Sequence, residues 1–210
     1  MDIYQDPMLS VTDAARYLAI PASTLATWRR EHTVHSQPPK HHGWPTLPFV
    51  GVIESFVLRS LREAGFTMRM IREAAEGVRR EFNDDYGLAR PQLGHDGAEI
   101  FLRFGGDLFR ARDRQQVIRE TVDSFSTFIE WQGEDPLRLK LKAYDSEVIL
   151  DPRFGWGRPV VARNKVPLEA ILGLWHGGDS MSDIATEFQM RRDDIERIIQ
   201  SYDAAGARAA

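Results

Sequence analysis

The stretch LSVTDAARYLAIPASTLATWRR, residues Leu9–Arg30, decides the fold of the first third of the chain. Its apolar residues recur at helical spacing in two short runs, and Ser10 or Thr12 would cap the first run. Ile20-Pro21 separates the runs and predicts a turn. Two short helices joined by a tight turn are the expected result. The positions that face inward are Ala14, Ala15, Leu18, Leu25 and Trp28.

The second helix leaves hydroxyls and arginines on its outer side. Small hydroxyls and arginine suit contacts with phosphates and base edges, and a helix fits the major groove of B-DNA. We therefore predict a DNA-reading helix, although units of this shape also serve as plain interaction modules. The predicted DNA-binding residues are Ser23, Thr24, Thr27, Arg29 and Arg30, together with Lys40 from the following loop.

The order of these residues resembles the N-terminal domain of MerR-type winged-helix regulators. That family has a Leu-Ser…Ala-Ala…Leu helix and a Thr-Leu…Trp recognition helix, which here correspond to residues 9–18 and 24–28. Residues 52–72, with the Gly65-Phe66 turn, resemble the family's second helical pair, and residues 32–47 would be the wing. The resemblance covers about 75 residues. The chain has 0 cysteines, so the family's metal-sensing mechanism is not carried over.

Two features of this first segment leave alternatives open. Met68, Ile71, Ala75, Val78 and Phe82 form a heptad-like seam that ends at residues 83–85, and it predicts either an intramolecular core or a dimer contact. Four histidines lie at positions 32, 35, 41 and 42. A metal site needs three or four converging ligands, so we favour a wing that touches the DNA backbone and predict no metal.

The middle segment predicts strands and one helix. Apolar runs at 100–104 and 108–112 flank Gly105-Gly106, which favours a hairpin. A helix is expected over 117–129, and residues 137–143 alternate as a strand does. The basic positions of that strand are either a partner-binding face or the charged side of an edge strand. They are Arg138, Lys140 and Lys142.

The last segment predicts two short strands followed by three helices. Strands are expected at 148–152 and 158–161, around a turn at 155–157. A helix should begin at Pro167 and end at Gly177-Gly178, and Ser180 should cap the next one. A third helix should begin near Arg192, and the tail from residue 204 should fray.

This segment resembles domain-of-unknown-function family 433, which occurs in antitoxins paired with PIN-domain ribonuclease toxins. The resemblance rests on residues 148–152, 157–161 and 163–167 and on the helix start at 182–185. Two positions depart from the family pattern, where Asn164-Lys165 replaces Thr-Arg and Asp183 replaces Glu. The resemblance implies a VapB-type antitoxin in which cations reach the acidic metal site of the toxin. The toxin-binding candidates are Arg138, Lys140, Lys142, Arg153, Arg158, Arg163 and Lys165.

Composition narrows the function classes. With 42% hydrophobic and 28% charged residues, the chain has the composition of a globular protein. The net charge of −4 is unusual for a nucleic-acid-binding protein, but residues 1–82 carry ten basic and nine acidic side chains. The absence of cysteine excludes disulfides, cysteine nucleophiles and iron–sulfur sites. The acidic N-terminus and the lack of a long apolar run favour the cytoplasm, without a membrane partner.

These observations combine into one prediction of architecture and function. The fold is α+β and mainly α, with a winged helix at 1–82, a mixed middle region at 83–144 and a β-hairpin plus trihelical domain at 145–210. No constellation of catalytic residues converges, so we predict no enzyme activity and no cofactor. The predicted function is a homodimeric antitoxin that binds a PIN-domain toxin and double-stranded operator DNA.

Two other classes remain open from the sequence. One is a ligand-responsive regulator without a toxin, and the other is a chromosome-associated adaptor. In the first, aromatic side chains of the middle segment would line a small-molecule pocket, although we favour a simple core. These aromatics are Phe101, Phe104, Phe109, Phe125, Phe128 and Trp131.

Overall fold

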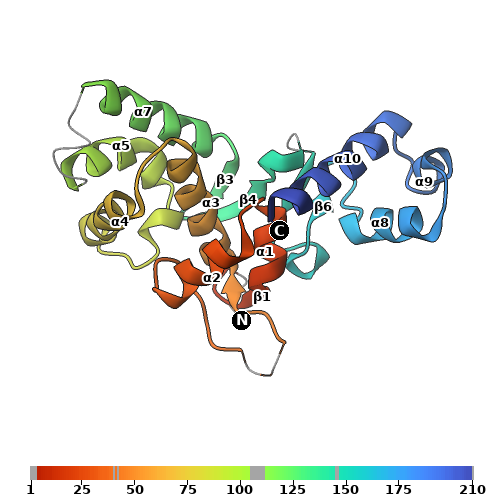
Figure 1. Cartoon of the computed structure of the whole chain (residues 1–210), viewed down its shortest axis with the longest axis horizontal. Coiled ribbons are helices and arrows are strands. Elements are labelled where there is room, and N and C mark those ends of the chain that lie inside the picture. The colour runs from red at the N-terminus through yellow and green to blue at the C-terminus, as the bar shows by residue number, and fades with distance from the viewer. Residues whose placement is uncertain (1–3, 40, 42, 105–111, 145–146, 210) are drawn as a thin grey trace.

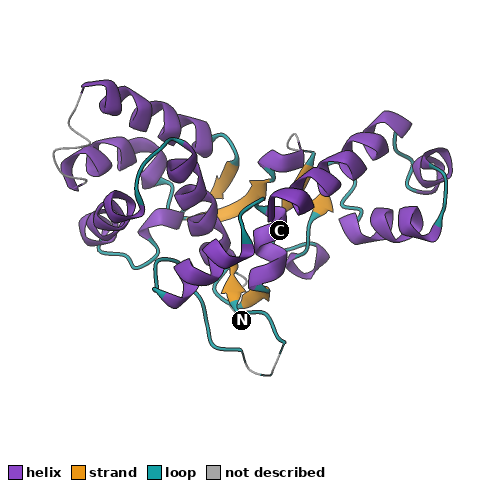
Figure 2. Cartoon of the chain, in the orientation of Figure 1, coloured by secondary structure: helices purple, strands orange, loops and turns teal. Residues whose placement is uncertain are grey.

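A computed structural model describes residues 4–39, 41, 43–104, 112–144 and 147–209. Helices form most of the molecule and the strands are short, so the fold is α+β and mainly α, as predicted (Figures 1 and 2). Among the described residues, none of the helices combines the length and the apolarity needed to cross a bilayer.

The first two helices form where the sequence predicts them. Helix α1 (Val11–Tyr17) is capped by Ser10, whose Oγ accepts a hydrogen bond from the Asp13 backbone N–H at 3.1 Å. A tight turn leads to α2 (Ala22–Arg30). The predicted inward side chains are almost completely buried, with relative exposures of 0–3%: Ala14, Ala15, Leu18, Leu25 and Trp28.

A small sheet closes the loop that follows α2. Strand β1 (Pro7–Leu9) pairs antiparallel with β2 (Leu47–Pro48), so the chain returns beside its own start. Of the described residues in the predicted wing at 32–47, only Leu47 lies in a strand. The wing is therefore a long loop that extends away from the helices (Figure 1) rather than a β-hairpin.

The second helical pair consists of α3 (Phe49–Glu63) and α4 (Met68–Phe82). Gly65 turns the chain with φ +86°, and Thr67 caps α4 by accepting the Met70 backbone N–H. Asn83 ends α4 in the left-handed conformation. The predicted seam on α4 packs against α5 within the same chain, which confirms the intramolecular alternative.

The middle segment is helical where one strand was predicted. Residues 100–104 belong to α5 (Gln92–Phe104), which packs against α7 (Arg112–Ser126). The strand prediction was wrong because a five-residue apolar run does not reveal its period. In α5 the buried side chains of Leu93, Ile100 and Phe101 recur at helical spacing, two turns apart. The predicted Gly105-Gly106 turn lies outside the described residues, and so do residues 108–111 of the strand predicted at 108–112. The last residue of that predicted strand, Arg112, is the first residue of α7.

A four-stranded antiparallel sheet joins the middle and last segments. Its strand order is β3 (Ile129–Gln132), β4 (Asp135–Lys140), β5 (Val148–Leu150) and β6 (Val160–Val161). Strand β4 therefore lies between two partners, and the edge-strand alternative was wrong. The partners of a strand depend on distant segments, which the alternation of its own residues does not encode.

Three helices follow the sheet, at the right of Figure 1. They are α8 (Leu168–Gly177), α9 (Met181–Glu187) and α10 (Arg192–Ala209). Ser180 caps α9 by accepting the Asp183 backbone N–H at 3.2 Å, and Gly178 ends α8 with φ +95°, both as predicted.

The end of α10 is packed rather than frayed. It lies along α1 (Figure 1), where Ala205 is 1% exposed and the Arg16 guanidinium lies 4.9 Å above the Tyr202 ring and donates a hydrogen bond to the Tyr202 hydroxyl. The predicted fraying from residue 204 was wrong, because a distant helix provides the apolar contacts that an isolated tail lacks.

Candidate nucleic-acid interface and partner surface

Helix α2 presents an open outer face. Ser23 and Arg30 are exposed and Thr24, Thr27 and Arg29 are half-buried, so no neighbouring segment covers them. The Arg30 guanidinium donates to the Thr27 hydroxyl at 3.3 Å, and Arg29 forms no ion pair with any described residue. Lys40, the sixth predicted contact, lies outside the described residues. The five others lie on one helix: Thr24 and Thr27 line one side of its outer face, and Arg29 flanks the opposite side.

A hollow of about 590 Å³ lies between α2 and the α3–α4 pair. Thr24 and Thr27 line it from α2, and three arginines line it from the other side: Arg59, Arg62 and Arg72. These arginines were not predicted from the sequence. Their signal was weak, because Arg59 and Arg62 occur on one ordinary helix and Arg72 on the next, and the turn at Gly65 brings Arg72 beside the other two.

Those arginines are held by local partners. Arg59 forms an ion pair with Glu63 at 2.7 Å, and Arg72 forms one with Glu31. Arg62 donates to the Phe66 carbonyl at 2.6 Å. The wall of the hollow is cationic but partly neutralised, which suits a weak supporting contact with a phosphate better than a sequence-specific one.

A second hollow, of about 520 Å³, lies on the other side of α2. The hydroxyl of Ser10 and the side chain of Arg29 line it, together with Trp44 from the loop. The Trp44 side chain is 53% exposed and packs edge-to-face on His41, with ring centroids 4.7 Å apart. Helix α2 is thus flanked on both sides by space that a bulky ligand could enter.

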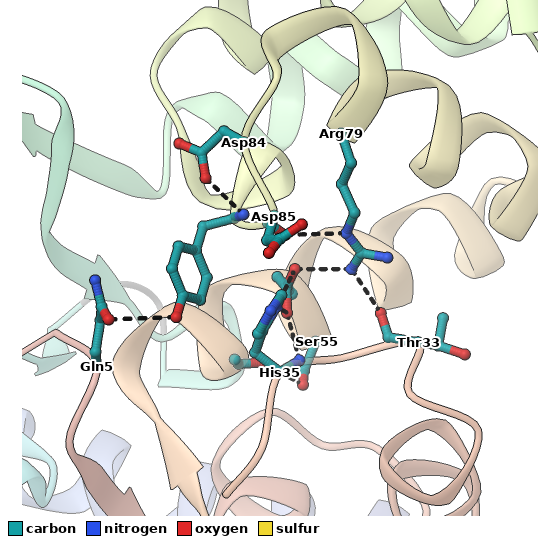
Figure 3. A network of polar contacts seen from close by, with 10 residues as sticks. Gln5, Thr33, His35, Ser55, Arg79, Asp84 and Asp85 are labelled. Atoms are coloured by element: carbon teal, nitrogen blue, oxygen red, sulfur yellow. Dashed lines mark hydrogen bonds and ion pairs between the residues drawn. The ribbon is translucent and has the colours of Figure 1, made fainter.

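A buried carboxylate fixes the base of the loop (Figure 3). Glu54 of α3 is 0% exposed and accepts hydrogen bonds from the His35 backbone N–H at 2.6 Å and from Arg79 Nη2 at 2.9 Å. Its Oε2 also lies 3.1 Å from His35 Nδ1. Arg79 in turn donates to the carbonyls of Thr33 and Asp85, at 3.0 and 3.1 Å. The network ties residues 33–35 to α3 and α4.

Two further contacts make this attachment close. The ring of Tyr86 lies 4.4 Å from that of His35, and its hydroxyl donates to the Gln5 side chain at 3.3 Å. Gly51 leaves room for the backbone, because a Cβ there would lie 2.2 Å from the His35 carbonyl oxygen. The loop therefore has a rigid base below its exposed tip.

The histidines of the loop take separate roles. His35 faces Glu54, His41 packs on Trp44, and His42 lies outside the described residues. Within the described part of the chain, no group of three or more His, Asp or Glu side chains is arranged to hold a metal ion.

The three basic positions of the predicted strand are engaged in ion pairs. Arg138 and Lys140 lie in β4, whereas the strand ends before Lys142, which begins a short 3₁₀ helix (Lys142–Tyr144). Arg138 and Lys140 both contact Glu130 of β3, at 2.9 and 3.3 Å, and Lys142 lies 3.4 Å from Glu63 of α3. These three predicted toxin contacts therefore do not form a free cationic face. Their main structural effect is to connect β4 to its neighbours.

The C-terminal candidates differ from one another. Arg153 binds both carboxylate oxygens of the buried Asp151, at 2.9 and 2.7 Å, and Arg158 pairs with Glu169. The hydrogen bonds that each guanidinium donates to its carboxylate raise the pKa of that guanidinium. Arg163 is exposed and forms no ion pair with any described residue. Lys165 donates to the Ala162 carbonyl.

The aromatic side chains of the middle segment belong mainly to the core. Phe101 and Phe125 are 0% and 2% exposed, and the ring of Phe128 lies 5.8 Å from that of Phe56. Trp131 is half-buried. The structure does not describe the side chain of Phe104 or any part of Phe109.

Two family models match this chain, one in its N-terminal part and one in its C-terminal part. Residues 7–75 match a family model described as "Putative DNA-binding HTH domain", and residues 148–201 match "Protein of unknown function (DUF433)". We name the two matched segments, residues 7–75 and 148–201, after the families they resemble, the helix-turn-helix domain and the DUF433 domain. The helix-turn-helix domain contains α1, α2 and the open face described above. The DUF433 domain contains β5, β6, α8, α9 and most of α10.

Two proteins resemble this chain over nearly its whole length. The chain resembles "Putative antitoxin VapB45" of Mycobacterium tuberculosis (strain ATCC 25618 / H37Rv), with 28% identity over 94% of this chain and 95% of the relative. It also resembles the crystal structure of Rv2018 from Mycobacterium tuberculosis, with 26% identity and a TM-score of 0.81. That match covers 93% of this chain and 99% of the other.

Proposed function

We propose that this chain is a cytoplasmic, non-enzymatic antitoxin that binds operator DNA through α2 and neutralises a PIN-domain ribonuclease toxin. The observation that carries the proposal is the uncovered hydroxyl and arginine face of α2 inside a helix-turn-helix domain. The name of the VapB45 relative and the DUF433 domain support the antitoxin half.

On DNA, α2 would enter the major groove. The hydroxyls of Ser23, Thr24 and Thr27 would contact phosphates or base edges, and Arg29 and Arg30 would contact guanine or phosphate. The tip of the loop at Trp44 would lie over the backbone beside that groove. Binding as a homodimer would match two half-sites and allow the protein to repress its own operon.

On the toxin, the cations of the DUF433 domain would meet carboxylates. Arginine suits such a contact because its planar fork pairs with a carboxylate through two hydrogen bonds. Arg163 is the first candidate, since no described acidic side chain neutralises it, whereas Arg138, Lys140 and Lys142 already carry partners.

The DNA half is tested with the promoter fragment upstream of this chain's gene. Electrophoretic shifts at several salt concentrations should show binding by the wild type. The affinity of R29A/R30A should be lower by about tenfold or more, and it should depend less steeply on the salt concentration. The control is Arg191→Ala, which removes a 72% exposed arginine from the DUF433 domain. Equal affinity of R29A/R30A and wild type would remove α2 as the reading helix.

The toxin half predicts that a PIN-domain protein is encoded beside this chain, and the test uses that protein. Co-expression should relieve growth arrest by that protein, and R29A/R30A should relieve it as well as the wild type does. This separation would place the two activities in different domains. Growth arrest that persists with the wild-type chain would contradict the antitoxin proposal while leaving DNA binding intact.

A further inference from the structure

An exposed aromatic ring lies close to two cations in the DUF433 domain. Phe154 is 37% exposed, and both the Arg153 guanidinium and the Lys165 ammonium lie 5.5 Å from its ring centroid. We propose that these three residues, here named the Phe154 platform, are the docking surface for an acidic protein partner. The proposal rests on the proposed function only for the identity of that partner, the PIN-domain toxin.

Backbone geometry fixes the position of the ring. The Phe154 backbone N–H donates to the Asp151 carbonyl at 3.0 Å, which closes a turn. Gly155 continues that turn with φ +60°, a conformation that favours glycine. The aromatic ring is therefore presented by a tight turn rather than by a loose loop.

Both cations are also held in place before any partner arrives. Asp151 is 0% exposed, and it accepts the Arg153 backbone N–H at 3.0 Å as well as two guanidinium hydrogen bonds. Lys165 donates to the Ala162 carbonyl at the edge of its own turn. A surface whose side chains are already ordered loses less conformational entropy on binding.

The composition of the platform fits a protein partner better than a nucleic acid. Aromatic and arginine side chains dominate the energetic centres of protein interfaces. Nucleic acids are held mainly by many unpaired cations, yet Asp151 neutralises Arg153 and Glu169 neutralises the nearby Arg158. Lys165 and Arg163 of the adjoining turn stay without an acidic partner among the described residues. Their positive charge would complement carboxylates on the partner, placed around an apolar pocket that receives the Phe154 ring.

The experiment measures the affinity of the PIN-domain protein for variants of the full-length chain by calorimetry. Phe154→Ala should weaken binding about thirtyfold, as loss of a central aromatic anchor does, and Phe154→Tyr should keep most of it. Lys165→Gly should also weaken binding, with a smaller salt dependence. Because Lys165 has φ +62°, glycine suits its backbone, and this variant should melt no lower than the wild type.

Arg191→Ala, an exposed arginine of the same domain, is the matched control and should bind as the wild type does. If the wild type forms the complex and Phe154→Ala and Lys165→Gly bind equally well, the platform is refuted and the antitoxin proposal stands. If Phe154→Ala does not fold, Lys165→Gly alone decides in the same way. If the wild type does not bind the PIN-domain protein, the antitoxin proposal fails, and the platform fails with it.

Discussion

Replacing Glu54 by alanine should destabilise the protein by about 3–5 kcal/mol, which is the usual cost of breaking a buried ion pair from one side. Glu54 is 0% exposed and accepts the His35 backbone N–H at 2.6 Å and Arg79 Nη2 at 2.9 Å. Alanine leaves that backbone N–H without an acceptor and leaves Arg79, only 20% exposed, with carbonyl partners alone. Both losses occur where water cannot easily replace the carboxylate.

The assay is thermal unfolding followed by circular dichroism. For a chain of this length about 1 kcal/mol shifts the midpoint by roughly 2–4 °C, so the expected decrease is about 6–20 °C. Glu63→Ala is the matched control, because Glu63 lies on the same helix and pairs with Arg59 at 2.7 Å, but is 43% exposed. That exposed pair should contribute less than about 1 kcal/mol.

The same pair of variants tests whether the network positions the loop. At a temperature where Glu54→Ala is still folded, its affinity for operator DNA should decrease, because residues 33–35 lose their attachment to α3. Rescue by Glu54→Gln, which keeps one acceptor oxygen, should be partial. Equal melting temperatures for Glu54→Ala and Glu63→Ala would refute the reasoning about burial.

Three further predictions concern stability. Burial raises the pKa of Tyr17 and Tyr144 above 10.0, so stability should be full below pH 10 and fall above it, by about 1.4 kcal/mol per pH unit for each tyrosine. In urea titrations at pH 9 and 11, Tyr144→Phe should roughly halve that loss. Gly51→Ala should lower the melting temperature, because its Cβ would meet the His35 carbonyl oxygen at 2.2 Å. Ser180→Ala should cost about 1 kcal/mol in urea unfolding through loss of the α9 cap.

Each of these has an outcome that would contradict it. An identical loss between pH 9 and 11 in wild type and Tyr144→Phe would mean that another group titrates. A Gly51→Ala variant as stable as wild type would show that the loop backbone moves freely from α3. A Ser180→Ala variant without any effect would show that α9 is fixed by its packing alone.

Local signals in the sequence predicted the helices that begin with a cap and end at a turn. Ser10 and Ser180 each precede a helix, and Gly178 follows one, because these residues satisfy backbone groups within four residues of themselves. Such signals do not depend on the rest of the fold. The half-buried and exposed hydroxyls and arginines of α2 were predicted from the spacing of its apolar residues, and their contact with DNA stays a prediction.

Contacts between distant segments could not be predicted from the sequence, for a physical reason. The partners of β4 come from β3 and β5, and the end of α10 is stabilised by α1 at the other end of the chain. Glu54 was missed although it carried a signal, a single carboxylate within the apolar run 49–58. A charge in such a run predicts a buried partner, but not that the partners are His35 and Arg79.

The contact between α10 and α1 can form only when synthesis of the chain is nearly complete. About 190 residues separate Tyr17 from Ala205, so roughly 10–40 s pass on the ribosome between them at usual elongation rates. Until the last turns emerge, α1 lacks the surface that covers it in the finished molecule. A chain released early would leave the first helix of the N-terminal segment without this cover.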